Sequence, residues 1–196
     1  MITPIVKEYE KFPFSEKEIL RYAGVKTETE DMISLTRSAI SEAENLLSYK
    51  VCYIECSVAV RDDVCDFGYF KTRSRALAKN LAGISRVIIF ASTVGVKIDR
   101  LITKYSHISP SRALIIQALG AERTEGLCDT FTKDMEATLH CHTRPRFSPG
   151  YGDLDISVQR DIFALLNPTK HIGLSLNDSL LMSPTKSVTA IMGIED

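Results

Sequence analysis

The stretch Ser187-Val188-Thr189-Ala190-Ile191-Met192-Gly193-Ile194 decides the fold, because its side chains alternate as they do in a β-strand. Ile172–Leu176 alternates in the same way, and Leu180–Met182 adds a third candidate strand. Strands joined only by turns pair antiparallel, whereas a doubly wound parallel sheet needs a helix in each crossover. The sequence therefore predicts an α+β fold, in which flanking helices cover a twisted, mostly antiparallel sheet.

Three segments upstream of this stretch are also predicted to be strands. Arg86–Ala91 contains a continuous apolar run, which is typical of a buried central strand. Val51–Val60 is rich in β-branched and aromatic residues, and a turn at Asp62-Asp63 leads from it to Val64–Phe70. We therefore expect the sheet to have Arg86–Ala91 near its centre.

Six helices are predicted from the spacing of apolar residues and from capping patterns. Ser15 and Glu18 have the form of a capping box, and small residues at Ala118, Gly120 and Gly126 indicate close approach by another element or by a ligand. The predicted ranges are Ser15–Tyr22, Glu28–Leu47, Ser74–Leu81, Thr93–Tyr105, Ser109–Glu136 and Asp155–Leu166. No linker interrupts the chain, so we expect one domain over residues 1–196, with a helical part at 1–50 and a mixed α/β body at 51–196.

Composition and charge indicate an ordinary globular protein. Of the 196 residues, 44% are hydrophobic and 25% are charged, and the net charge of −1 gives no overall field that would attract nucleic acid or an anionic membrane. The N-terminus reaches charged residues before any long apolar run, so neither an export signal nor a membrane span is expected. Five scattered cysteines are then most simply interpreted as reduced thiols in a cytoplasmic protein.

Several common chemical motifs are absent from the sequence. It contains no G-x-G-x-x-G fingerprint, no phosphate-binding P-loop and no G-x-S-x-G elbow. His140 and His142 would share one face of an extended segment, but no second pair stands at zinc-site spacing, so a polar strand is favoured over a metal site. Cys52 and Cys56 share a strand face and are expected to pack in the core.

The densest turn chemistry lies in Arg146-Phe147-Ser148-Pro149-Gly150-Tyr151-Gly152-Asp153. Arg146 supplies a planar, permanently charged fork that matches a carboxylate. Gly150 allows backbone to approach a ligand closely, and Tyr151 offers an aromatic face to a cation. Together these residues suit a small zwitterion. A structural turn with a surface arginine is the simpler interpretation of the same spacing.

This segment resembles the R-x-x-P-G-Y motif of the activation domain of cobalamin-dependent methionine synthase, especially in its short, stand-alone members. The resemblance is good from about Ile88 to Ile194. It is carried, beyond the motif, by Ala118–Asp129, Ser148–Leu154, Val158–Ile162, Ile172–Met182, Pro184 and Lys186–Ala190. The resemblance implies the same α+β fold.

The resemblance also implies which residues bind S-adenosylmethionine. Arg146 matches the arginine that holds the methionyl carboxylate, and Ser148 and Gly150 match positions that contact the ligand through backbone. Tyr151 matches the tyrosine beside the ligand, and Glu125 matches a helix glutamate that faces the pocket. No residue is expected to act as a catalytic acid, base or nucleophile, and no metal ligand is implied.

The function implied by the resemblance is reactivation of a partner. The chain would bind S-adenosylmethionine and support reductive remethylation of cob(II)alamin on a separate cobalamin-binding methionine synthase chain, with an electron from a flavodoxin- or ferredoxin-type donor. Two alternatives stay open: an independent S-adenosylmethionine-dependent methyltransferase, and a non-catalytic module that binds a corrinoid protein.

The sequence departs from the family pattern at two places. The family site also uses an aspartate near the start of the domain, for which this sequence shows no clear equivalent. It further uses residues beyond the last strand, which this chain, ending at Asp196, does not reach. We therefore expect weaker ligand binding, or a site that the partner completes.

Overall fold

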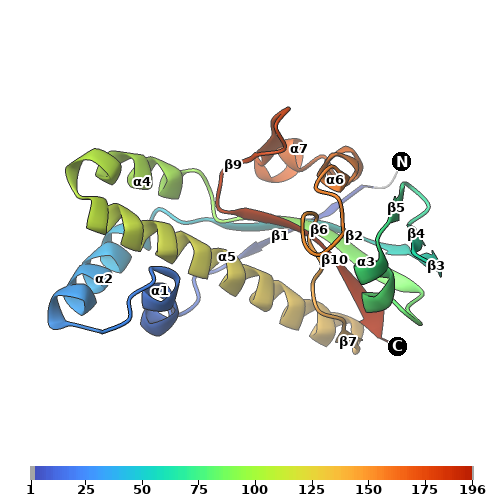
Figure 1. The fold of residues 1–196 in the computed structure, drawn as a ribbon, viewed down its shortest axis with the longest axis horizontal. Helices are drawn as coiled ribbons and strands as arrows, with labels where there is room; N and C mark the ends of the chain where they lie inside the picture. Colours follow the sequence, from blue (N-terminus) through green and yellow to red (C-terminus); the bar gives the residue numbers. More distant parts are fainter. Residues whose placement is uncertain (1–2, 196) are drawn as a thin grey trace.

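A computed structural model describes residues 3–195 of the chain, built around one five-stranded sheet (Figure 1). Every pair of neighbouring strands in this sheet is antiparallel, which confirms the predicted fold class. The strands, in spatial order, are β1 (Ile5–Tyr9), β2 (Tyr49–Ser57), β6 (Arg86–Thr93), β10 (Ser187–Glu195) and β7 (His142–Thr143).

The centre of the sheet is the pair β6 and β10. Their register places Phe90 opposite Ala190 and Ile88 opposite Met192, and all of β6 after Arg86 is buried. A strand buried on both faces needs apolar side chains at consecutive positions, which explains its continuous apolar run. The predicted strand Ser187–Ile194 and the predicted central position of residues 86–91 are thus confirmed.

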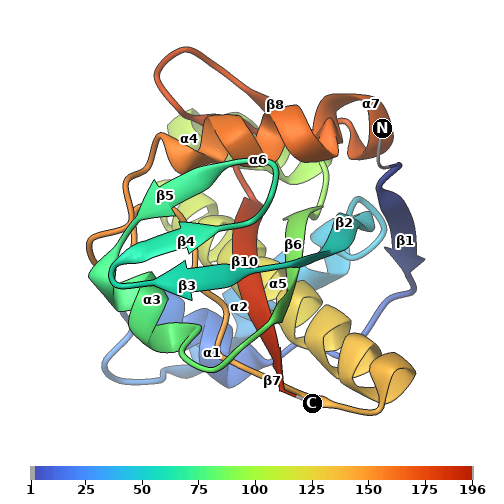
Figure 2. The same cartoon turned by 90° about the vertical axis from the view of Figure 1, so that its right-hand side faces the viewer.

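Helices and a small sheet cover the two faces of the central sheet. Alternate residues of each strand point to opposite faces, so Val51 and Ile88 enter one core while Cys52 and Ile89 enter the other. The first core packs under α1 (Glu16–Tyr22), α2 (Glu30–Ala43), α4 (Lys97–Ile108) and α5 (Pro110–Leu139). The second packs under α3 (Arg75–Asn80), α6 (Val158–Leu166), α7 (Pro168–Ile172) and the three strands β3 (Ala59–Arg61), β4 (Val64–Asp66) and β5 (Lys71–Arg73) (Figure 2).

Cys52 is buried in the second core and the partly buried Cys56 packs against it, as expected. A short hairpin of β8 (Ser175–Leu176) and β9 (Met182–Ser183) precedes β10. Among residues 3–195, no helix combines the length and the apolar character that crossing a bilayer requires.

A buried arginine fastens the N-terminal segment to α5. Arg123 is 1% exposed, lies between the rings of Phe12 and Phe14, and donates to the carbonyl oxygens of Phe12 and Pro13 at 2.8 Å. It also pairs with the adjacent Glu122, which accepts a hydrogen bond from the backbone N–H of Ser15. This network places α1 against the middle of α5.

The structure corrects several expectations about secondary structure. The predicted strand Val64–Phe70 ends at Asp66, and of Leu180–Met182 only Met182 belongs to a strand. Residues 1–50 are not wholly helical, because β1 pairs with β2 and adds an edge strand, an arrangement set by contacts distant in sequence. Ile172–Leu176 is not a continuous strand. Pro168 is the first residue of α7, a position where no helical hydrogen bond needs the N–H that proline lacks. Ile172 is the last residue of this helix, and only Ser175–Leu176 is extended.

Candidate functional site

One stripe of α5 lines the candidate site, a cavity of about 570 Å³. Glu125, Cys128, Thr132 and Glu136 follow one another three or four residues apart, the spacing that places side chains on one helix face. The small residues of α5 serve the protein's own packing. A side chain at Gly126 would meet the ring of Phe12 at 2.6 Å.

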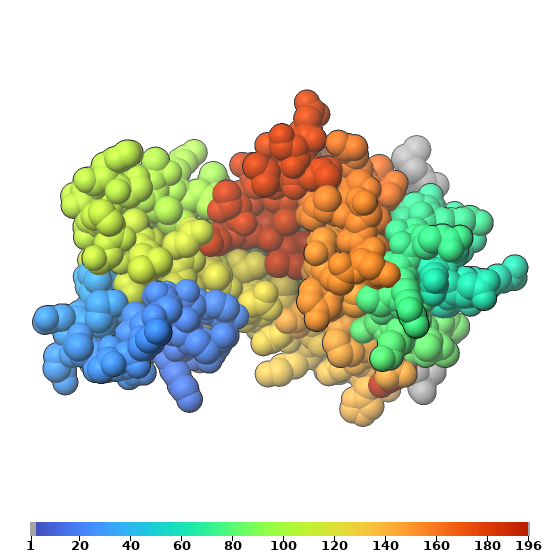
Figure 3. Space-filling model, viewed as in Figure 1, coloured from blue at the N-terminus to red at the C-terminus, as the bar shows by residue number. Residues whose placement is uncertain are grey.

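The opposite wall of the cavity is the segment that follows β7. Phe147 and Ile191 exchange backbone hydrogen bonds of 2.8 and 2.9 Å, which hold this segment against β10. Phe147 packs into the second core, so its neighbours Arg146 and Ser148 face the other way, toward α5. In Figure 3 the orange residues of this segment lie beside the yellow middle of α5, with red residues of β10 between them. The remaining lining residues are Thr143, Arg144, Pro145, Tyr151 and Val188.

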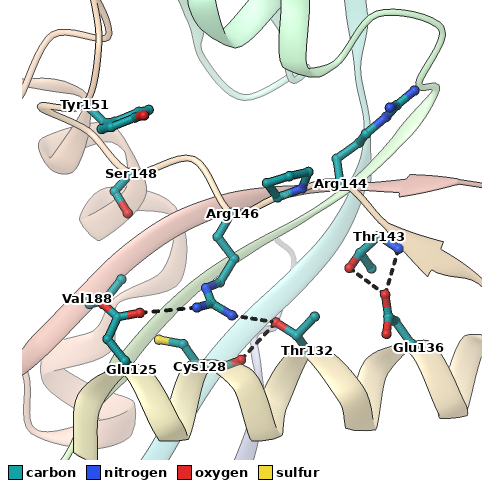
Figure 4. A pocket seen from close by; sticks show the side chains of 11 residues that line it. Glu125, Cys128, Thr132, Glu136, Thr143, Arg144, Arg146, Ser148, Tyr151 and Val188 are labelled. Atoms are coloured by element: carbon teal, nitrogen blue, oxygen red, sulfur yellow. Dashed lines mark hydrogen bonds and ion pairs between the residues drawn. The ribbon is translucent and has the colours of Figure 1, made fainter. Parts of the chain in front are cut away.

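Arg146 is the central charge of the cavity. Its side chain is 23% exposed and points at α5, where it meets Glu125 at 3.2 Å, Asp129 at 2.8 Å and the hydroxyl of Thr132 at 3.2 Å (Figure 4). Burial lowers the pKa of Arg146, while the neighbouring Cys128, Asp129 and Glu125 raise it, and the net shift is upward. The guanidinium therefore stays charged, and its two carboxylate partners leave the cluster with one net negative charge.

The turn after Arg146 has a backbone conformation that requires a glycine. Gly150 has φ of +88°, in the left-handed region where other residues are strained, and its N–H donates to the Leu154 carbonyl at 2.8 Å. Tyr151 is 67% exposed at the rim of the cavity, with its ring 5.2 Å from that of Phe147. Gly150 itself does not line the cavity. Its backbone contact with a ligand stays a prediction.

Asp153 fixes the far end of this turn to α3. Its carboxylate accepts hydrogen bonds from the Ser74 hydroxyl at 2.5 Å and from the backbone N–H groups of Arg75 and Ala76 at 2.9 and 3.1 Å. These bonds, that of Ser74 above all, lower the pKa of Asp153 below its ordinary value of 3.8. The stabilisation is therefore complete above that value and is lost as the pH falls through the lower folded-state pKa.

We expect Asp153→Asn to lower the free energy of unfolding at pH 7, because the amide cannot replace the carboxylate at all three donors. Urea denaturation at a series of pH values measures the effect. The gap between wild type and variant should narrow below about pH 4 as the wild-type carboxyl protonates. An equal gap at neutral and acidic pH would show that ionisation of Asp153 does not stabilise the turn.

The thiol and the imidazoles near the cavity show no arrangement for nucleophilic or metal chemistry among residues 3–195. Burial raises the pKa of the Cys128 thiol to about 11, so it is protonated at neutral pH and is a poor nucleophile. His140 adopts a left-handed conformation at the end of α5 instead of joining a strand, so it does not share a strand face with His142 as expected. Within residues 3–195, no three His, Cys, Asp or Glu side chains form a group able to hold a metal.

Four of the five residues predicted for the site line this one cavity: Glu125, Arg146, Ser148 and Tyr151. Sequence reasoning missed Asp129, which is the nearest acid to Arg146 and is not itself one of the residues that line the cavity. Its signal was available, because a residue four positions after Glu125 on a helix faces the same way.

Comparisons with known proteins identify the family and the fold of this chain. A family model described as "Vitamin B12 dependent methionine synthase, activation domain" matches residues 76–196. Among 13 matching chains of solved structures is a MetH reactivation domain bound to AdoHcy, with a TM-score of 0.68 and 14% sequence identity. The match covers 97% of this chain and 78% of that one, and shows a shared fold. A search of curated protein sequences gives no match.

Proposed function

This chain belongs to the vitamin B12 dependent methionine synthase activation domain family, and from this we propose that it binds S-adenosylmethionine in the cavity beside Arg146. The bound ligand would support reductive remethylation of cob(II)alamin on a separate cobalamin-dependent methionine synthase chain. A related fold holds AdoHcy, the compound that S-adenosylmethionine becomes when it loses its methyl group.

The observation that carries this proposal is the charge pattern around Arg146. Its guanidinium offers a planar fork for the α-carboxylate of the ligand. The two carboxylates that flank it give the cluster a net negative charge, which attracts a ligand that has an ammonium and a sulfonium besides its carboxylate. A cavity of about 570 Å³ has room for a nucleoside joined to an amino acid.

The residues of this chain would act by placement. S-adenosylmethionine supplies the methyl group, and the partner's cobalamin, reduced by one electron from a flavodoxin- or ferredoxin-type donor, accepts it. Arg146 would anchor the amino-acid end, and the turn that Gly150 and Asp153 shape would border the rest of the ligand. Cys128, protonated by virtue of its burial, would not compete for the methyl group. Orientation of the sulfonium toward the incoming corrinoid is the contribution expected of the protein.

The exposed rim fits a ligand that must meet a second protein. Tyr151 is 67% exposed at the cavity edge, so the reacting end of a ligand beside it would stay within reach of a docked chain. A chain that is not tethered to its partner lacks the high effective concentration a linker provides, so binding between the two should depend on the concentration of both.

The direct test uses oxidised methionine synthase that lacks its own activation domain. Adding this chain, S-adenosylmethionine and a reductant should restore methionine synthesis, with the ligand's methyl group appearing on the cobalamin. Omitting S-adenosylmethionine should abolish the effect. Methyl transfer to a small acceptor without any corrinoid protein would favour an independent methyltransferase. Corrinoid-protein binding without saturable binding of S-adenosylmethionine would indicate a non-catalytic module.

A further inference from the structure

A second carboxylate, to which the family resemblance assigns no role, is the closest acid to the arginine of the cavity. Oδ1 of Asp129 lies 2.8 Å from Nη1 of Arg146, whereas Oε2 of Glu125 lies 3.2 Å from Nη2. The two acids stand one helical turn apart on α5, so both approach the guanidinium from the same helix. Arg146 thus pairs with both acids, and its single positive charge balances only one of their two negative charges.

We propose that Asp129 binds the α-ammonium group of the ligand and makes the cavity selective for a free α-amino acid end. This inference rests on the proposed function, in which Arg146 binds the α-carboxylate. One carbon separates the two groups of an α-amino acid, so an ammonium whose carboxylate lies on Arg146 is held beside the groups that flank the guanidinium. Asp129 is the nearest of these.

Binding of the ligand removes hydrogen bonds from the two acids that pair with Arg146. A ligand carboxylate on Arg146 takes hydrogen bonds that Asp129 and Glu125 now receive. If the ligand has no positive charge, the carboxylates of Asp129 and Glu125 then lie next to the carboxylate of the ligand. Like charges at short distance repel one another. An α-ammonium replaces the lost partner and cancels the repulsion. The site therefore discriminates against a ligand that has the carboxylate alone.

A simpler role for Asp129 makes a different prediction. If Asp129 only pairs with Arg146 until a ligand displaces it, substitution of Asp129 should raise the affinity for every carboxylate ligand by the same factor. If Asp129 binds the ammonium, substitution of Asp129 should lower the affinity for the ligand that has an ammonium more than the affinity for the ligand that lacks one. The ratio of two affinities separates these roles, even where overall affinity or stability changes.

The experiment compares AdoHcy with its deamino analogue, in which hydrogen replaces the α-amino group, by calorimetric titration. The proteins are wild type, Asp129→Asn and, as a control with the same change of charge, Asp161→Asn. Asp161 is exposed on α6, which packs on the other face of the sheet. Wild type and the control should prefer AdoHcy. Asp129→Asn should reduce that preference by about threefold to tenfold, a modest factor because the Asp129 side chain is 61% exposed.

An unchanged preference in Asp129→Asn, with AdoHcy still bound, would overturn the role of Asp129 and leave the proposed function standing. A wild-type protein that binds both compounds equally would do the same. Failure of the folded wild-type chain to bind AdoHcy or S-adenosylmethionine at all would overturn both proposals together.

Discussion

Arg146→Ala should lower the affinity for S-adenosylmethionine by about 10- to 150-fold while leaving the fold intact. Hydrogen bonds between charged groups contribute about 1.5–3 kcal/mol, and each 1.4 kcal/mol corresponds to a tenfold change in affinity. The same change removes the positive charge that pairs with both Glu125 and Asp129, so these two carboxylates would repel the ligand's carboxylate. Calorimetric titration at fixed ionic strength measures it.

Two further variants make this result interpretable. Arg146→Lys keeps the charge but loses the planar fork, so its affinity should fall between those of wild type and Arg146→Ala. Arg160→Ala removes an exposed arginine from α6 and should bind like wild type. If Arg146→Ala binds as tightly as Arg160→Ala, the carboxylate of the ligand does not lie on Arg146.

Arg123→Ala should destabilise the whole domain, by about 3–5 kcal/mol, because it leaves a buried carboxylate without its partner. Glu122 is 7% exposed, and Arg123 is its ion-pair partner. The change also leaves the carbonyl oxygens of Phe12 and Pro13 without the hydrogen bonds that Arg123 donates to them. Urea denaturation, followed by circular dichroism, gives the free energy of unfolding.

The matched control for this prediction is Arg37→Ala. Arg37 and Glu16 also form an ion pair between two helices, but both side chains are exposed and the atoms lie 3.1 Å apart. Surface pairs of this kind contribute about 0–1 kcal/mol. Equal destabilisation by Arg123→Ala and Arg37→Ala would mean that the network under Phe12 and Phe14 does not hold α1 on α5.

The sequence predicted the parts of the fold that depend on local patterns. The apolar run of residues 86–91 correctly predicted a central strand, and the alternation of residues 187–194 correctly predicted a strand. The edge strand β1 escaped prediction because five residues with two charges have no clear period, and pairing with β2 determines their conformation. The short helix α7 escaped prediction because the alternation of Ile172, Leu174 and Leu176 extended the predicted strand over the last residue of that helix.

The site was predicted from a different source. Resemblance to a family identified Glu125 and Arg146, but spacing alone could not bring together two residues that lie 21 positions apart and meet at 3.2 Å. The roles of Asp129 and Asp153 depend on which elements meet. Asp153 reaches α3 across 79 positions of the sequence, a contact that no local pattern records.

The most direct test of the account is a crystal structure of this chain with AdoHcy. The account predicts that the ligand occupies the cavity between α5 and the turn after β7, with its carboxylate on the guanidinium of Arg146 and its ammonium next to Asp129. Density for the ligand at another place, with Arg146 still bound to Asp129 and Glu125, would contradict it.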